Sequence, residues 1–155
     1  MGVVPEIQNA NESYAAGFDK GGLPMPPGRR FAVVTCMDAR LDPAKFLGLE
    51  EGDAHVIRNA GGLVTDDALR SLVISHHLLG TQEIVVIGHT DCGMLTFRDE
   101  EVQGQLGTDI PLLAFPDLEE SVRASVQRVR ESSLVPDAVS GFVYEVGSGR
   151  LRPID

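Results

Sequence analysis

Between residues 31 and 146, short apolar runs alternate with segments whose apolar residues recur every three or four positions. Residues 31–35 and 83–87 are too short for a core helix and are typical of strands buried on both faces. Residues 139–146 predict a further strand, with Gly147 and Gly149 starting a turn or hairpin, and residues 55–58 predict a weaker strand. Strands separated by helices pair in parallel, so the sequence predicts an α/β fold: a mostly parallel sheet flanked by helices.

Two helices in this region have recognisable starts. Thr65 or Asp66 can cap the first, which Gly80 closes, and Asp117 with Glu120 forms a capping-box pattern for the second. Each helix has one apolar stripe that is expected to face the core. These inward residues are Leu69, Leu72, Val73, His76 and Leu79 in the first helix, and Leu118, Val122, Val126 and Val129 in the second.

The first 28 residues differ from this alternating body. Residues 6–20 predict a helix that begins near Pro5 and ends at Gly21. Its apolar stripe comprises Ile7, Asn11, Tyr14, Ala15 and Phe18. Residues 21–28 contain three prolines and three glycines, which favour neither helix nor strand. We therefore predict a helical arm and Gly/Pro linker over residues 1–28, and one α/β domain over residues 29–155.

Composition excludes several classes of function. The chain has 155 residues, enough for one domain with its own core. Thirteen Lys and Arg against twenty-three acids give a net charge of −10, which argues against a nucleic-acid partner. No apolar run is long enough to cross a bilayer, and no secretion signal is visible, so we expect a cytoplasmic protein without a membrane partner.

Two cysteines, Cys36 and Cys92, are separated by 55 residues. Cys36 follows the first predicted strand of the body, and His89 and Cys92 follow the strand at 83–87. Loops at the carboxyl ends of neighbouring parallel strands converge, so these three side chains are expected to meet. Thiolates with an imidazole favour zinc, and three protein ligands with an open fourth position indicate a catalytic zinc site. On spacing alone, the alternative is that the three side chains are simply part of the core.

Three motifs carry a resemblance to a known family. Together, in order and in spacing, they resemble the signature of the β-class carbonic anhydrases over roughly residues 31 to 93. The motifs are Cys36-Met-Asp38-Ala-Arg40, Arg58-Asn-Ala-Gly-Gly62 and Gly88-His89-Thr-Asp-Cys92-Gly93. Plant-like members of the family carry a glutamine shortly before the first ligand. Residues 23–30 have none, and the chain has no tryptophan, so it resembles the compact prokaryotic subgroup.

The resemblance implies roles for individual residues. Cys36, His89 and Cys92 match the ligands of one zinc ion per chain. Asp38 and Arg40 match a catalytic pair in which the aspartate accepts a hydrogen bond from zinc-bound water or hydroxide. In some members this aspartate moves onto the metal, so Asp38 is also a conditional fourth metal ligand. Three glycines are expected to border the substrate pocket, where they permit close backbone approach: Gly61, Gly62 and Gly93.

The implied function is that of a carbonate dehydratase, a zinc lyase that reversibly hydrates carbon dioxide to bicarbonate and a proton by zinc-bound hydroxide. The implied assembly is a homodimer or a higher homo-oligomer with exchanged N-terminal arms. One alternative is a carbon disulfide or carbonyl sulfide hydrolase on the same scaffold. The other is a non-catalytic, zinc-stabilised binding or regulatory module, and the intact Asp38–Arg40 pair counts against it.

Other polar residues near the motifs have simpler interpretations. His55, His76 and His77 are candidate proton carriers, but His76 shares the apolar face of its helix and His77 is expected at the surface. Asp42 and Asp91 lie beside the motifs, and we expect each to be solvated or to cap a turn.

Overall fold

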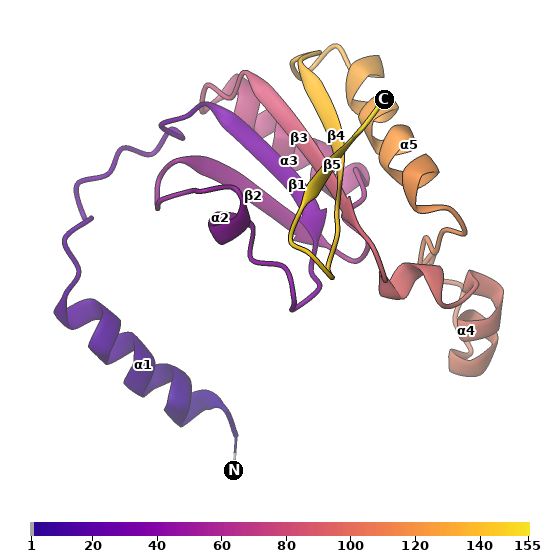
Figure 1. Ribbon diagram of the computed structural model, residues 1–155, viewed down its shortest axis with the longest axis horizontal. Helices are drawn as coiled ribbons and strands as arrows, with labels where there is room; N and C mark the ends of the chain where they lie inside the picture. Colours follow the sequence, from indigo (N-terminus) through magenta and orange to yellow (C-terminus); the bar gives the residue numbers. More distant parts are fainter. Residues whose placement is uncertain (1) are drawn as a thin grey trace.

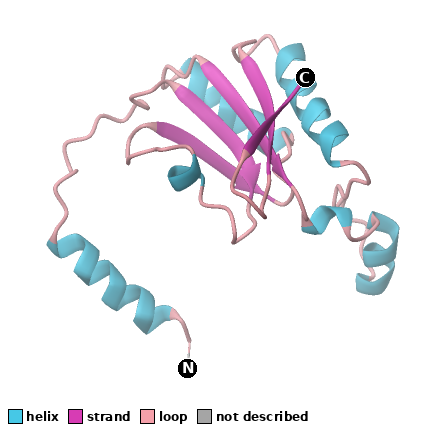
Figure 2. Ribbon diagram, in the orientation of Figure 1, coloured by secondary structure: helices cyan, strands magenta, loops and turns pink. Residues whose placement is uncertain are grey.

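The computed structural model describes residues 2–155, and these form a single five-stranded sheet with helices packed against it (Figures 1 and 2). The order across the sheet is β2-β1-β3-β4-β5. The three pairs among β1 to β4 are parallel and β5 is antiparallel to β4, so the predicted α/β class is confirmed. The strands are β1 Phe31–Cys36, β2 Ala54–Asn59, β3 Glu83–His89, β4 Val139–Tyr144 and β5 Leu151–Ile154.

Helices α3 (Asp66–His77) and α5 (Leu118–Glu131) cover one face of the sheet. Both start at the predicted caps: the Thr65 side chain accepts a hydrogen bond from the backbone of Ala68, and Asp117 accepts one from Glu120. Strand residues that share one side of the pleat pack against the buried faces of the two helices. The core includes Ala32, Val34, Ile84, Val86, Val143, Leu72, Val122, Val126 and Val129.

Helix α5 approaches the sheet closely because Gly88 has no side chain. A Cβ at Gly88 would lie 2.8 Å from a methyl carbon of Val122. The opposite face of the sheet carries the short helix α2 (Pro43–Phe46), whose Phe46 ring stacks on Tyr144 with 4.4 Å between ring centroids. The strand ends that carry Cys36 and His89 therefore lie in a sheet that is covered on both faces.

Helix α1 spans Val4–Ala16 and stands apart from the sheet, joined to β1 by an extended linker (Figure 1). None of its residues is buried, and Ile7 and Tyr14 are more than half exposed. The helix ends at Ala16 with Gly17 as its C-cap, and not at Gly21 as predicted. The prediction was too long because the apolar spacing continues to Phe18, beyond the last helical turn. Contacts of Tyr14 and Lys20 with Glu51 connect the arm to the rest of the chain.

Several elements differ from the sequence prediction. The structure adds helices α2 and α4 (Asp99–Leu106). Of the turn or hairpin expected after residue 146, it forms the hairpin, with β5 antiparallel to β4. A 3-10 turn, η1 (Gly93–Leu95), follows Cys92. Cys36 and His89 are the last residues of their strands and do not follow them. Across residues 2–155, no helix has the length and apolar character needed to span a membrane.

Candidate metal centre

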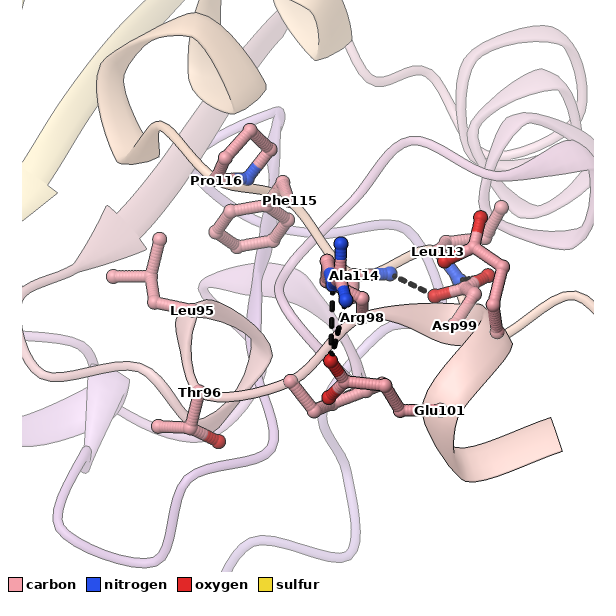
Figure 3. Close-up of a pocket in the computed structure, with 11 residues that line it drawn as sticks. Leu95, Thr96, Arg98, Asp99, Glu101, Leu113, Ala114, Phe115 and Pro116 are labelled. Atoms are coloured by element: carbon pink, nitrogen blue, oxygen red, sulfur yellow. Dashed lines mark hydrogen bonds and ion pairs between the residues drawn. The ribbon is translucent and has the colours of Figure 1, made fainter. Parts of the chain in front are cut away.

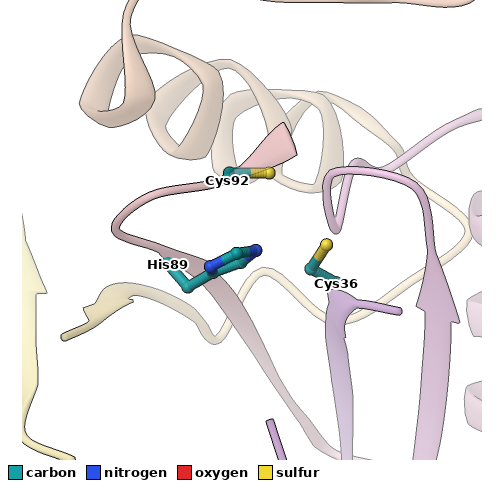
Figure 4. Close-up of side chains that lie close together, drawn as sticks. All are labelled: Cys36, His89 and Cys92. Carbon is teal, nitrogen blue, oxygen red and sulfur yellow. The ribbon is translucent and has the colours of Figure 1, made fainter. Parts of the chain in front are cut away.

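Cys36, His89 and Cys92 meet at the carboxyl edge of the sheet, as the sequence predicts (Figure 4). Strands β1 and β3 are parallel neighbours, with Thr35 opposite Ile87, so their last residues arrive at the same edge. A tight turn after β3 then brings Cys92 back toward the other two side chains. The two sulfur atoms and a ring nitrogen all lie within 4.8 Å of one another, and all three residues are buried.

The imidazole of His89 is oriented for metal binding. Its Nδ1 lies 2.8 Å from the backbone carbonyl oxygen of Thr90, an acceptor, so Nδ1 carries the proton and donates it. This leaves Nε2 with a lone pair. Nε2 is buried and has no hydrogen-bond partner in residues 2–155. A buried acceptor without a partner is costly unless something fills the space, and a metal ion between Nε2 and the two sulfurs would do so.

The two thiols differ in acidity. Burial raises the pKa of Cys36, but neighbouring His89 and backbone N–H groups outweigh it and lower that pKa to about 7. Burial raises the pKa of Cys92 to about 11, with a contribution from nearby Cys36. Cys92 therefore needs a nearby positive charge to ionise, and a divalent cation in this gap would supply it. The donor set fits a soft metal ion such as zinc.

Asp38 and Arg40 form a bidentate pair beside the three side chains. Nε and Nη2 of Arg40 donate to Oδ1 and Oδ2 of Asp38 at 3.0 and 2.8 Å, and the backbone N–H of Arg40 donates to Oδ1. These bonds hold the pKa of Asp38 well below its usual range. Oδ2 of Asp38 also lies 3.7 Å from Nε2 of His89, so the ionised carboxylate borders the gap.

Two contacts at the site lie outside the sequence interpretation. Arg58 donates from Nε to the carbonyl oxygen of Cys36 and from Nη2 to that of Asp38, both at 2.8 Å, and so holds the backbone that carries both residues. The side chain of Asp91 is 75% exposed, so the residue is solvated as expected, and it also accepts a hydrogen bond from Nη1 of Arg40 at 2.8 Å. Asp42 does cap a helix, as expected, by accepting from the backbone of Lys45.

A cavity of about 360 Å³ opens onto the sulfur atoms, and two of the three predicted pocket glycines line it. Gly61 and Gly93 lie in its wall, whereas Gly62 lies behind it, against the end of β1. With φ of +64°, a Cβ on Gly62 would stand 2.8 Å from the backbone nitrogen of Cys36. The lining comprises Cys36, Met37, Asp38, Ala60, Gly61, Cys92, Gly93, Met94, Thr96 and Phe97.

A larger cavity of about 670 Å³ lies on the far side of Thr96 and Phe97 and includes none of the three candidate ligands (Figure 3). One wall is a loop held by Asp99, whose carboxylate accepts three backbone N–H groups, each at 2.9 Å. The donors are Leu112, Leu113 and Ala114. This arrangement holds the loop that leads to Phe115, which lines the larger cavity, and it is a structural role for Asp99.

The three candidate proton carriers lie away from the centre, and none lines the smaller cavity. His55 contacts the hydroxyl of Ser75 at 2.6 Å, and His76 contacts the carbonyl oxygen of Thr81 at 2.6 Å. His77 is exposed on α3, as expected. Their surroundings therefore give no reason to assign them to the site.

Two thiols, one imidazole and an adjacent Asp–Arg pair at the carboxyl edge of a parallel sheet define a class of α/β metalloprotein with an open catalytic centre. A family model described as carbonic anhydrase matches residues 31–114, more than half of the chain. The chain belongs to the carbonic anhydrase family, and its relatives place it in the β class.

Three of these relatives are informative. The chain is 46% identical to a protein named beta-carbonic anhydrase 1 from Mycobacterium bovis, over 99% of both chains. It is 48% identical to a solved carbonic anhydrase from Glaciozyma antarctica, with a TM-score of 0.92 and complete coverage of both chains. It is also 46% identical to a carbon disulfide hydrolase from Saccharolobus solfataricus, over 96% of this chain and 87% of that protein.

Proposed function

We propose that this chain is a zinc-dependent carbonate dehydratase that reversibly hydrates carbon dioxide to bicarbonate and a proton. Cys36, His89 and Cys92 hold one zinc ion per chain. The observation that carries the proposal is the unpartnered Nε2 of His89, buried and facing two thiols, beside an Asp38 carboxylate that Arg40 keeps ionised. A purely structural zinc site normally has four protein ligands and needs no such pair.

Bound zinc supplies the positive charge that makes water a nucleophile near neutral pH, an effect for which carbonic anhydrase is the standard example. Asp38 provides an ionised acceptor at the edge of the gap, so it can hold a proton of the attacking water and direct the oxygen lone pair toward carbon. Arg40 keeps that carboxylate charged and turned away from the metal position. Walls formed by Met94 and Phe97 suit a small apolar substrate.

Carbon disulfide hydrolysis is the second candidate, since a hydrolase of that name is 46% identical to this chain. The matches to carbonic anhydrases cover at least 99% of both chains, whereas the match to the hydrolase covers 87% of that protein. This difference favours hydration of carbon dioxide. Stopped-flow hydration of carbon dioxide and hydrolysis of carbon disulfide, measured on one zinc-loaded preparation, separate the two. We expect the hydration to be far faster. The reverse ranking would favour the hydrolase, and inactivity toward both substrates would favour a non-catalytic module.

The ligand assignment has its own test in X-ray absorption at the zinc edge. We expect two sulfur neighbours per zinc in the wild-type protein. Fewer than two in unoxidised protein would contradict the assignment. Replacing Cys92 by serine should weaken zinc binding and abolish hydration, because a hard alcohol replaces a soft thiolate.

We also propose a cytoplasmic homodimer in which residues 1–28 act as an exchanged arm beside the catalytic domain at 29–155. Ile7, Tyr14 and Phe18 of the arm are each more than half exposed. Strand β2 is an edge of the sheet, and Val56 on it is 41% exposed. Such surfaces are normally covered by another chain. Free thiols serving as ligands also suit a reducing compartment.

A further inference from the structure

Asp91 occupies a distinctive position between two of the candidate zinc ligands. It lies in the turn that joins His89 to Cys92, and its φ of +55° is in the left-handed region, which aspartate tolerates better than most residues. In this conformation two acceptors of Asp91 face the same guanidinium. Its Oδ2 accepts from Nη1 of Arg40 at 2.8 Å, and its backbone carbonyl oxygen accepts from Nη2 at 2.9 Å.

Arg40 is thereby held from two sides. The guanidinium makes two hydrogen bonds to Asp38 and two to Asp91, which engages four of its five N–H groups. The Arg40 side chain is 49% exposed, and an arginine this exposed with one partner would exchange among rotamers in solvent. The Asp91 side chain is itself 75% exposed, but Asp91 accepts at both its carboxylate and its backbone carbonyl. This double contact restricts the motion of Arg40 and leaves its Nε–Nη2 edge directed at the Asp38 carboxylate.

The same contacts connect the two loops that carry the ligands. Residues 37–41 follow Cys36, and residues 90–95 contain Cys92. Within residues 2–155, the hydrogen bonds from Arg40 to Asp91 are the only ones between these two loops. The pair therefore fixes the distance between the loop of Asp38 and the loop of Cys92.

We propose that Asp91 is a positioning residue for the hydration reaction: it holds Arg40 in place, and through Arg40 it holds the carboxylate of Asp38 beside the metal centre. This inference rests on the proposed function. Asp91 itself lies outside the lining of the cavity that opens onto the sulfurs, so it acts through Arg40 and not on the substrate.

The test uses Asp91→Asn and Asp91→Gly, because both replacements tolerate a positive φ and the turn should fold in each. Asp91→Gly removes the carboxylate and keeps the backbone carbonyl that contacts Arg40. The matched control is Glu101→Gln, which removes one negative charge from the exposed Arg98–Glu101 pair without touching Arg40. All proteins are loaded with zinc.

The first readout is ¹⁵N NMR of the Arg40 Nε–H group. In both Asp91 variants we expect its exchange with water to accelerate by about fivefold or more, as the guanidinium loses one charged partner. In hydration kinetics, kcat should fall about three- to tenfold while KM for carbon dioxide changes by less than about twofold. The urea midpoint of unfolding should stay unchanged, and the control should match wild type in every measurement.

An Arg40 signal and kcat that both remain at wild-type values in Asp91→Gly would overturn the proposal. A lowered urea midpoint with an unchanged Arg40 signal would also overturn it, since Asp91 would then only support the turn. If the wild-type protein hydrates no carbon dioxide, the proposed function fails. The NMR comparison then still decides whether Asp91 positions Arg40.

Discussion

At the scale of single residues, the site depends on which group Asp38 faces. Its carboxylate lies 3.7 Å from Nε2 of His89 on one side and is paired with Arg40 on the other. An unpaired carboxylate beside a divalent cation is itself a good ligand for it. In the proposed mechanism, the pairing with Arg40 therefore determines whether Asp38 accepts a hydrogen bond from the attacking water or coordinates the metal itself.

Arg40→Ala should nearly eliminate hydration while zinc remains bound. Without the guanidinium, Asp38 is an unpaired carboxylate next to the metal position and should take the place that water needs. Stopped-flow kinetics together with zinc content per chain check this expectation. Near wild-type hydration at neutral pH in this variant would show that the pair has no such role.

Activity should be low below neutral pH and rise above it. Arg40 holds the pKa of Asp38 far below its usual range. The ion pair therefore contributes its full stability above the unfolded-state pKa of about 4. That contribution is lost only as the pH falls through the lower pKa of the folded state. Asp38 therefore stays ionised from pH 6 to 9. What changes in that range is the hydroxide concentration. Hydroxide competes with Asp38 for the open coordination position at the metal, and it gains as the pH rises. A flat profile in non-coordinating buffer would contradict this account.

At the scale of elements, the close contact between the Arg58–Gly62 segment and β1 sets the position of Cys36. Gly62→Ala adds a Cβ at 2.8 Å from the backbone nitrogen of Cys36, at a φ of +64°. We expect a loss of about 2–4 kcal/mol in the free energy of unfolding, combining backbone strain with overpacking. Zinc affinity should fall as well.

Gly48→Ala is the matched control for this substitution. Gly48 has the same φ of +64°, but nothing lies within 4 Å of its added Cβ. It should therefore lose only about 1–2 kcal/mol, from strain alone. Urea titration of both variants measures the difference, and equal losses would mean that contact with β1 contributes nothing.

The elements also show what sequence patterns can and cannot predict. Strands β1 and β3 and helices α3 and α5 were predictable because continuous apolar runs and capped stripes leave few alternatives. The hairpin after residue 146 was one of two expectations, and its returning strand β5 could not be delimited because it is four residues long and contains Pro153, which suits only an edge strand. The end of α1 was misplaced because Phe18 continues the apolar spacing past Gly17.

The same distinction applies to the site. The meeting of Cys36 with His89 follows from parallel strands that end at one edge, so the sequence alone indicates it. The contacts of Arg58 could not be predicted, because its acceptors are backbone carbonyl oxygens. Asp91 is solvated as expected, with its side chain 75% exposed, but its contact with Arg40 could not be predicted, because it depends on a positive φ that no local pattern indicates.

At the scale of the whole molecule, the open question is what covers α1. Deleting residues 1–27 should give a monomeric or aggregated product with reduced hydration, because the surface that the arm covers in the proposed dimer would be exposed. Light scattering measures the mass of the product. A truncated protein that is still dimeric, stable and fully active would show that the arm does not hold the dimer together.

Point substitutions in the full chain give a milder version of this test. Ile7→Ala with Tyr14→Ala removes apolar area from the arm and should weaken the dimer. Gln8→Ala with Ser13→Ala, at exposed polar positions of the same helix, should leave its dissociation constant unchanged.

The separation of the two thiols along the chain has a consequence for the order of events during folding. Cys36 ends β1 and Cys92 follows β3, and the whole of β2 and α3 lies between them. The three donors can meet only after this long crossover has closed, so zinc capture belongs to the last stage of folding. Zinc should then leave the refolding rate nearly unchanged and slow unfolding, because its contacts would form only after the folding transition state. Stopped-flow folding with and without zinc would reveal a refolding rate that depends on the metal if the centre forms early.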